Sequence, residues 1–194
     1  MTDSAWKTPF WPENVSKTTV PEYDYPVFEM LDRAAAEYPD KVFTIFNGAE
    51  RTYAKVKDTA DRIARFLADK GIKKGDRVAL ILPNLPHYPE IFFGITKTGA
   101  TCVTCNPVYT GPELHHQLAD SEAKMVFCMD HPQFYENIRI AVKDSQVEDV
   151  VICNIKSYLP KLKGILGSLL NKIPKAETHD PNHLFFDDIV ASSK

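Results

Sequence analysis

The stretch GDRVALILPNLPHYPEIFFGITKTGATCVTCNPVYTGPELHHQL, from Gly75 to Leu118, decides the fold. Its apolar pattern predicts a strand over Arg77–Leu82, a helix over Leu85–Lys97 and a short strand over Thr101–Thr104, with another helix after Thr110. Continuous apolar strands joined by helices indicate a mostly parallel sheet that is covered on both faces. The fold class is therefore expected to be α/β, with helices on both faces of the sheet.

Thr110 and Glu113 supply the start signal of the helix that closes this stretch. In TGPE, a Thr side chain at the N-cap can accept from the N3 amide, while a Glu at N3 accepts from the N-cap amide. The sequence therefore predicts a capping box at this helix.

The alternation of strands and helices extends on both sides of the central stretch. Asn47-Gly48 predicts the turn of a hairpin. Apolar spacing elsewhere predicts strands over Val42–Phe46, Arg51–Tyr53, Met125–Cys128 and Val147–Ile152, and helices over Ala54–Lys70 and Pro132–Lys143. We expect three parts: an extended arm (1–24), an α/β subdomain (25–154), and an amphipathic segment with a lead-in to a missing downstream region (155–194).

Composition narrows the function classes. The chain has 194 residues, 44% of them hydrophobic, which is enough to build a core. A net charge of -3, with no basic cluster interleaved with aromatics, argues against nucleic acid as a partner. No stretch has the length and apolarity of a signal peptide or membrane span, so a cytoplasmic protein is expected.

The four cysteines lie in apolar, strand-like runs, where thiols behave as small buried hydrophobes. Cys102 and Cys105 have the C-x-x-C spacing, but they fall in a strand rather than at a helix N-terminus, where the thiol pKa would be lowered. No second pair completes a zinc site. We expect neither disulfides nor a metal site.

Several separated motifs carry a family resemblance. A PN pair at the end of a strand, then a helix, KTGA, a short strand and NPVYTGPELHHQLADSEAK, resembles the N-terminal region of acyl-CoA synthetases of the adenylate-forming (AMP-binding) superfamily. The segment RTYAKVKDTADRIARFLADKGIKKGDRVAL is similar to that family as well. The resemblance covers residues 25–151 and is closest to long-chain fatty acid CoA ligases. It implies a parent enzyme that converts a fatty acid, MgATP and CoA into acyl-CoA, AMP and pyrophosphate through an acyl-adenylate.

The resemblance also places residues near substrate or CoA, because ligands of open parallel sheets bind outside the carboxyl ends of the strands. These candidates are Asn84, Asn106, Val108, Tyr109 and Thr110. Some relatives carry at the position of Val108 an Arg that contacts a CoA phosphate, so that contact is in doubt here. The NPVYT pattern fits fatty acyl ligases. A purely structural role for Asn106–Thr110, as turn and helix cap, is equally open.

Nucleotide-binding and catalytic motifs are missing from the sequence. Neither G-x-G-x-x-G nor G-x-x-x-x-G-K-[ST] occurs. In the resembled family, the Ser/Thr/Gly-rich phosphate loop, the adenosine-binding motifs and the catalytic lysine of the C-terminal domain all lie further along. We therefore expect the N-terminal piece of a longer ligase, or a truncated version of one, that has no catalytic residue and binds no cofactor alone. The alternative is a noncatalytic α/β module that binds a ligand or a protein partner.

Three further features have competing interpretations. Asp130 is expected to cap the following helix, and His115 and His116 are expected on the surface. The segment Lys156–Lys175 has a face of Leu and Ile bordered by lysines. It is interpreted either as an amphipathic helix packed on its own domain or as a peripheral membrane contact near a membrane-dissolved fatty acid.

Overall fold

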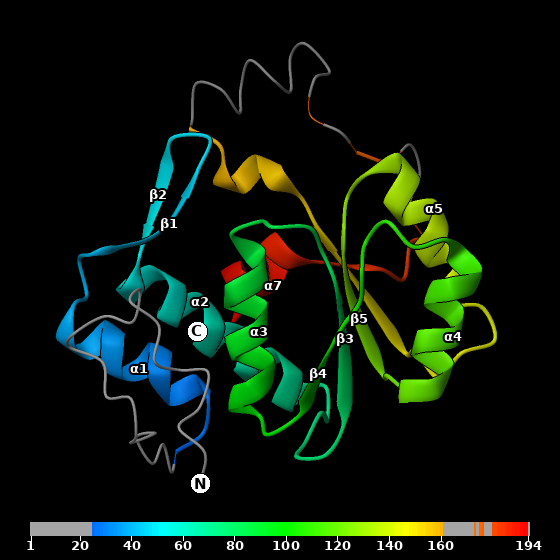
Figure 1. Cartoon of the computed structure of the whole chain (residues 1–194), viewed down its shortest axis with the longest axis horizontal. Helices are drawn as coiled ribbons and strands as arrows, with labels where there is room; N and C mark the ends of the chain where they lie inside the picture. Colours follow the sequence, from blue (N-terminus) through cyan, green and yellow to red (C-terminus); the bar gives the residue numbers. More distant parts are fainter. Residues whose placement is uncertain (1–24, 161–172, 174, 177–179, 194) are drawn as a thin grey trace, which may run out of the picture.

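The computed structural model describes residues 25–160, 173, 175–176 and 180–193. They form a parallel five-stranded sheet in the order β4-β3-β5-β6-β7 and a separate antiparallel hairpin, β1-β2. Helices flank the sheet on both sides (Figure 1). The expected α/β fold class is confirmed.

The strands and helices occur in the order that the apolar pattern of the sequence predicts. The strands are β1 (Val42–Phe46), β2 (Ala49–Thr52), β3 (Arg77–Ile81), β4 (Thr101–Thr104), β5 (Met125–Met129), β6 (Asp149–Cys153) and β7 (Leu184–Phe185). The helices are α1 (Phe28–Glu37), α2 (Tyr53–Asp69), α3 (His87–Lys97), α4 (Gly111–Ser121), α5 (Pro132–Ala141), the 3-10 helix η1 (Ile155–Tyr158) and α7 (Phe186–Ser192).

Strand β5 lies at the centre of the sheet, and all five of its residues are buried. Its neighbour β3 pairs with it in parallel, so that Val78 lies opposite Met125 on one side and opposite Cys102 of β4 on the other. The continuous apolar runs in the sequence correspond to these strands because both of their faces are covered.

Alternating residues of the strands belong to two separate cores. One core joins the sheet to α2, α3 and α7, and includes Leu80, Phe127 and Phe186. The other joins it to α4 and α5, and includes Ala79 and Leu114. Figure 1 shows α2 and α3 on one side of the strands and α4 and α5 on the other. The described part of the chain is thus a three-layer α/β unit, with α1 packed outside α2.

Helices α2 and α3 approach closely at Gly94. A Cβ at this position would lie 2.6 Å from Ile63 Cγ2 and 3.1 Å from the carbonyl oxygen of Ala60. Only glycine allows this approach, which sets how closely the second half of α3 packs against α2.

The hairpin prediction is confirmed, with Asn47 at φ 51° and Gly48 at φ 89° in the turn. The expected strand over Arg51–Tyr53 ends earlier, because Thr52 caps α2 by accepting from the amide of Lys55 at 3.4 Å. Tyr53 is therefore the first residue of α2. Likewise α3 begins at His87 rather than Leu85, because Leu85 and Pro86 complete the turn after β3.

The C-terminal part of the described chain belongs to the same sheet. Residues 183–190 were expected only as a lead-in to a downstream region, whereas Leu184 pairs in parallel with Val151 and Phe186 is buried in the core beside α2. The arm at residues 1–24 and most of the amphipathic segment, residues 161–172 and 174, lie outside the described residues. The first residues of the amphipathic segment, Lys156 to Tyr158, belong to the 3-10 helix η1 rather than to an α-helix.

Candidate functional site

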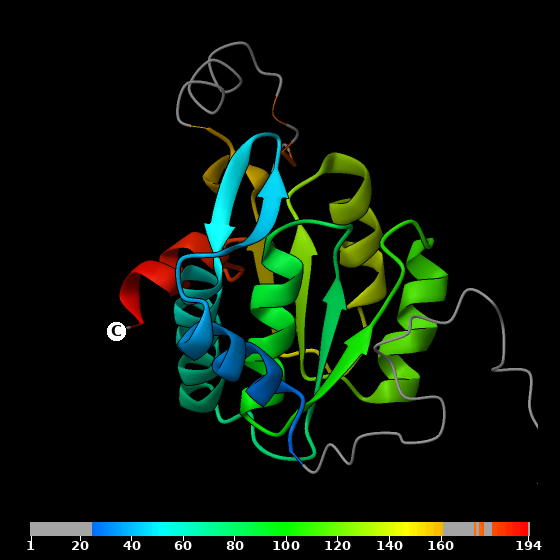
Figure 2. The ribbon, with the colours of Figure 1, turned by 60° about the vertical axis from the view of Figure 1, so that its left-hand side comes forward.

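The predicted substrate-facing residues follow two neighbouring parallel strands. Asn84 comes after β3 and Asn106 after β4, and the two strands pair in register, with Leu80 opposite Thr104. Both asparagines are exposed. In Figure 2 the arrows of the parallel sheet point toward the edge at which the β1-β2 hairpin lies. The fold therefore brings Asn84 and the Asn106–Thr110 loop to the same carboxyl edge.

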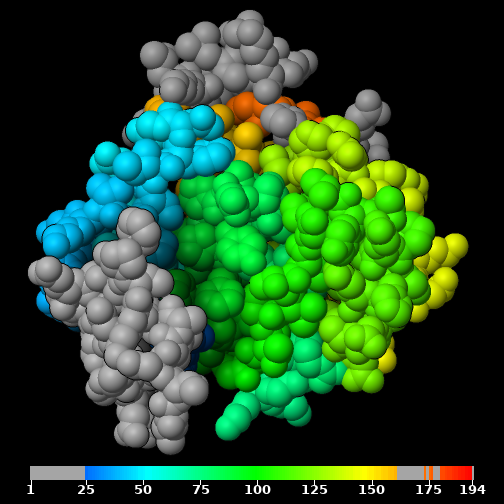
Figure 3. Space-filling view, in the orientation of Figure 1, coloured from blue at the N-terminus to red at the C-terminus, as the bar shows by residue number. Residues whose placement is uncertain are grey.

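A pocket of about 260 Å³ opens at this edge between the hairpin and the start of α3. Figure 3 shows the hairpin against this part of the surface. The pocket is lined by Thr44, Ile45, Phe46, Asn84, Leu85, Pro86, Tyr88 and Pro89. Of the predicted site residues, Asn84 lines it, and the residues of the Asn106–Thr110 loop are not among its lining.

Polar groups of the Asn106–Thr110 loop form hydrogen bonds with other residues of the chain. Asn106 Oδ1 accepts from the amide of Val108 at 3.2 Å, and the Tyr109 carbonyl accepts from Asn137 Nδ2 at 3.1 Å. Val108 is 65% exposed and makes no such bond through its side chain. These contacts support the structural interpretation of the loop without assigning any of its residues to a substrate.

The capping box at α4 is confirmed. Glu113 Oε2 accepts from the amide and from the hydroxyl of Thr110, both at 2.8 Å. These bonds lower the pKa of Glu113, because they favour its ionised form. Thr110 therefore has a structural function whether or not it also contacts a substrate.

Replacing Thr110 with Ala should lower the free energy of unfolding by about 1 kcal/mol, through the loss of N-capping. Urea denaturation of the variant measures this change, with His116→Ala, an exposed substitution on the same helix, as control. Unchanged stability of Thr110→Ala would show that the capping interpretation is wrong.

The cap assigned to Asp130 is wrong. The helix α5 begins after His131 without a side-chain cap, and the carboxylate of Asp130 is buried, with the residue 5% exposed. It accepts from Asn154 Nδ2 and from the amide of Ala176, both at 2.8 Å. These two partners are distant in sequence, so the local cap pattern did not reveal that Asp130 joins two segments at the carboxyl edge.

The two adjacent histidines of α4 differ. His116 is exposed as expected, whereas His115 is half-buried and its Nδ1 lies 2.9 Å from the carbonyl oxygen of Ala141. His115 therefore connects α4 with the end of α5. The expected surface position therefore holds only in part for His115.

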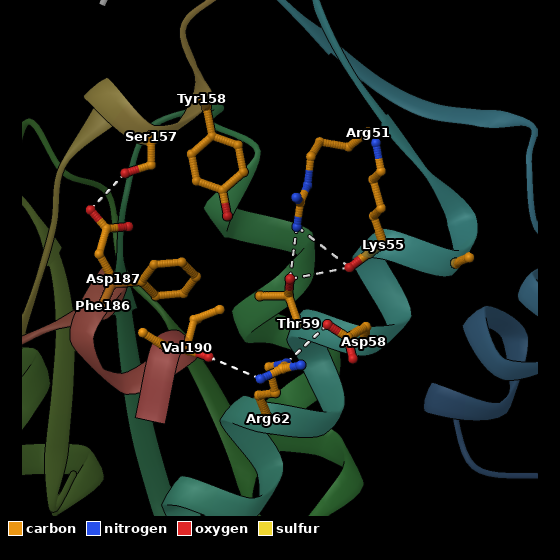
Figure 4. A pocket seen from close by; sticks show the side chains of 12 residues that line it. Arg51, Lys55, Asp58, Thr59, Arg62, Ser157, Tyr158, Phe186, Asp187 and Val190 are labelled. Carbon is orange, nitrogen blue, oxygen red and sulfur yellow. Dashed lines mark hydrogen bonds and ion pairs between the residues drawn. The ribbon is translucent and has the colours of Figure 1, made fainter. Parts of the chain in front are cut away.

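A second, larger hollow lies on the face covered by α2 and α7. We call it the α2–α7 cleft; its volume is about 580 Å³. It is lined by Arg51, Ala54, Lys55, Asp58, Thr59, Arg62, Ser157, Tyr158, Phe186, Asp187, Val190 and Ala191. Figure 4 shows the polar side chains of α2 along one wall, facing the aromatic rings of Tyr158 and Phe186.

A fully buried carboxylate, Glu90, lies behind this cleft. Its Oε1 accepts from Arg51 Nε at 2.9 Å and Nη2 at 2.6 Å, and its Oε2 accepts from the hydroxyl of Tyr158. Burial raises the pKa of Glu90 to about 7, although the charge of Arg51 opposes this shift. Burial likewise raises the pKa of Tyr158, so this hydroxyl remains a donor. The network joins β2, α3 and η1.

His87 lies one turn before Glu90 and is also completely buried. Its ring packs against Tyr158, with centroids 4.3 Å apart, and against Phe186, at 4.8 Å. Neither ring nitrogen makes a hydrogen bond of good geometry among the described residues, although the backbone of Asn154 lies near enough to oppose the lowering of the pKa of His87 weakly. Burial and the nearby charge of Arg51 lower the pKa of His87 to about 3. His87 is therefore neutral at physiological pH, and unfolding would let it take up a proton.

The pKa of His87 predicts a pH-dependent effect of His87→Met. In acid the unfolded chain binds a proton at its ordinary pKa of 6.5 while the folded chain does not, so the wild type loses stability as the pH falls below this value. Between about pH 6.5 and about pH 4, the free energy of unfolding of the wild type should fall by up to about 1.4 kcal/mol more per pH unit than that of the variant. At neutral pH it should be as stable as the wild type or more so, because no polar nitrogen stays buried.

Chemical denaturation across this pH range checks the prediction, with His116→Met as the exposed control. Parallel stability curves for His87→Met and the wild type would contradict the assignment. Glu90 acts in the opposite direction, because its raised pKa makes the fold lose stability as the pH rises toward 7. Both proteins contain Glu90, so its effect cancels in the difference between their curves.

This buried group of Arg51, His87, Glu90 and Tyr158 is not predicted by the local sequence pattern. One signal was available: His87 and Glu90 interrupt the apolar face of α3 that Ile91 and Ile95 continue. Buried charge in a helix requires a partner. The partners, in β2 and η1, could not be located without the tertiary structure.

Known proteins resemble this chain in sequence and in fold. The pattern described as AMP-binding enzyme matches residues 31–186. A long-chain-fatty-acid--CoA ligase of Salmonella typhimurium is 32% identical over 166 residues, which are 85% of this chain and 29% of that protein. A ligase of the same name from Bacillus subtilis is 36% identical over 143 residues, covering 74% of this chain and 25% of the relative.

Solved structures share the fold. A benzoate CoA ligase from Burkholderia xenovorans LB400 superposes with a TM-score of 0.67 at 16% identity, covering 87% of this chain and 29% of that one. An anthranilate CoA ligase in complex with anthranoyl-AMP gives 0.69 at 21% identity, covering 87% and 28%. The chain thus spans less than a third of the length of these relatives.

Proposed function

Because this chain belongs to the AMP-binding enzyme family and covers the N-terminal part of its domain, we propose that its parent protein is a long-chain fatty acid CoA ligase. This proposal rests mainly on one observation: the chain is 32% identical, over 85% of its length, to a relative named long-chain-fatty-acid--CoA ligase. The proposed reaction joins a fatty acid to CoA at the expense of ATP. It releases AMP and pyrophosphate and passes through an acyl-adenylate. A noncatalytic module is not favoured, since the similarity extends through the sheet rather than over one motif.

Within this reaction the 194-residue chain would supply scaffold and one wall of the substrate site. Asn84 and the loop Asn106–Thr110 are the proposed substrate- or CoA-facing residues, because they stand at the carboxyl edge of adjacent parallel strands. The phosphate loop, adenosine-binding residues and catalytic lysine would come from elsewhere in the parent. Such a protein would act in the cytoplasm.

Isothermal titration of the 194-residue chain with MgATP and with CoA tests this division of labour. No MgATP binding is expected, because the sequence contains no glycine-rich phosphate loop. In parallel, the complete reading frame that contains the chain should form acyl-CoA from a long-chain fatty acid, and require both ATP and CoA. Micromolar, single-site MgATP binding by the chain would show that the nucleotide-binding residues are misplaced.

We further propose that the segment Lys156–Lys175 makes a peripheral membrane contact. The sequence supports this with Leu and Ile on one face and lysines around it, a pattern suited to the boundary of an anionic bilayer. No helix within the described ranges is long and apolar enough to cross a membrane. The contact is thus proposed on the surface of the bilayer.

Co-sedimentation with anionic liposomes tests this contact. The chain should sediment with them, and the double substitution Leu166→Asp and Leu170→Asp should abolish sedimentation while leaving the far-ultraviolet circular dichroism unchanged. Neutral liposomes provide the control. If the double variant unfolds, the leucine face belongs to the core and the proposal fails.

A further inference from the structure

One side of α2 presents polar side chains to the α2–α7 cleft. The hydroxyl of Thr59 donates to the Lys55 carbonyl, and Arg62 donates to Asp58 and to the carbonyls of Val190 and Ser193. Lys55, Thr59 and Arg62 are spaced at i, i+4 and i+7, so they share one side of the helix. Thr59 accepts from Arg51 Nη2 at 2.7 Å, which positions the guanidinium at this wall. Figure 4 shows Arg51 reaching toward Thr59 from above the helix.

Arg51 and Lys55 retain free donors toward the cleft they line. The bonds of Arg51 to Glu90, Thr59 and the Lys55 carbonyl use its Nε and Nη2. Its Nη1, and the ammonium of Lys55, have no hydrogen-bond or ion-pair partner within the described ranges. The Arg51 side chain is 27% exposed. A guanidinium held on one edge and free on the other is preorganised to receive an anion.

The remaining lining residues define what kind of anion fits. Asp58 pairs with Arg62 at 2.9 Å, and Asp187 accepts from the hydroxyl of Ser157 at 2.6 Å. The lining thus holds three cations and two carboxylates, which favours a single negative charge over two. The rings of Tyr158 and Phe186 on the facing wall suit an apolar body.

We propose that the α2–α7 cleft binds a small monoanionic carboxylate, with its charge on Arg51 and Lys55 and its hydrocarbon part against Tyr158 and Phe186. The cleft volume of about 580 Å³ lies within the range of pockets that bind small molecules. The site is separate from the carboxyl-edge residues assigned to the ligase reaction. It is therefore an additional binding site and does not depend on the proposed activity.

Binding should be coupled to a proton on Glu90. A ligand carboxylate competes with Glu90 for the same guanidinium, so occupancy favours the protonated form of Glu90. The other groups that face Glu90 carry no charge near neutral pH: the Tyr158 hydroxyl donates to it, the pKa of His87 is lowered by burial, and that of Cys153 is raised by burial. Arg51 is the charged group in contact with it among the described residues.

Calorimetric titration of the chain with benzoate tests the proposal. Affinity should be higher at about pH 6 than at about pH 8, and comparison of buffers with different ionisation enthalpies should show proton uptake. Backbone amide shifts should move at Thr59, Ser157 and Phe186. Lys55→Gln should weaken binding about fivefold, the effect of one exposed ion pair, while Lys143→Gln, an exposed lysine outside the cleft, should change nothing.

Two ligand controls separate the contributions. Benzyl alcohol, which keeps the ring without the charge, and inorganic phosphate should both bind more weakly than benzoate. Glu90→Gln should remove the pH dependence, and proton uptake by the wild type gives the same information if that variant does not fold. The proposal is overturned if phosphate binds more tightly, if both lysine variants weaken binding equally, or if the shifts map to another face.

Discussion

The buried carboxylate of Glu90 connects the parts of the molecule that the sheet alone does not hold together. Arg51 comes from the hairpin, Glu90 from α3 and Tyr158 from η1, and all three lie on the same face of the sheet. Removing either partner would leave a polar group buried without compensation, which is among the most destabilising changes in a protein core. This carboxylate therefore helps to hold the hairpin over the carboxyl edge, together with the packing of Phe43 and Phe46 against the cores.

The same network determines the shape of two surface hollows. On one side, Arg51 and Tyr158 form part of the α2–α7 cleft. On the other, the hairpin contributes Thr44, Ile45 and Phe46 to the pocket beside Asn84. A shift of β2 would thus alter both. The edge where the ligase family's substrates are proposed to bind and the cleft proposed for a carboxylate are connected through the β1-β2 hairpin, which gives Thr44, Ile45 and Phe46 from β1 to one and Arg51 from β2 to the other.

Sequence reasoning identified the elements whose signals are local. The strands β3 and β5 are read from apolar runs, the α4 cap from Thr110 and Glu113, and the hairpin from Asn47-Gly48. It failed where the deciding partner is distant in sequence. Asp130 looks like a helix cap until Ala176 is placed beside it, and Glu90 looks misplaced until Arg51 and Tyr158 surround it. The short strand β7 has too few residues to show a period.

The bonds of Asp130 have a consequence for how this fold can vary in length. Its two oxygens hold Asn154, just before η1, and Ala176, where the chain returns toward β7. Because both ends are fixed to one carboxylate, the chain between them closes on itself regardless of its own conformation. Doubling the length of such a loop costs only about 0.6 kcal/mol in closure entropy. The position is therefore suited to insertions, where a homologue could acquire a different surface module and leave the sheet unchanged.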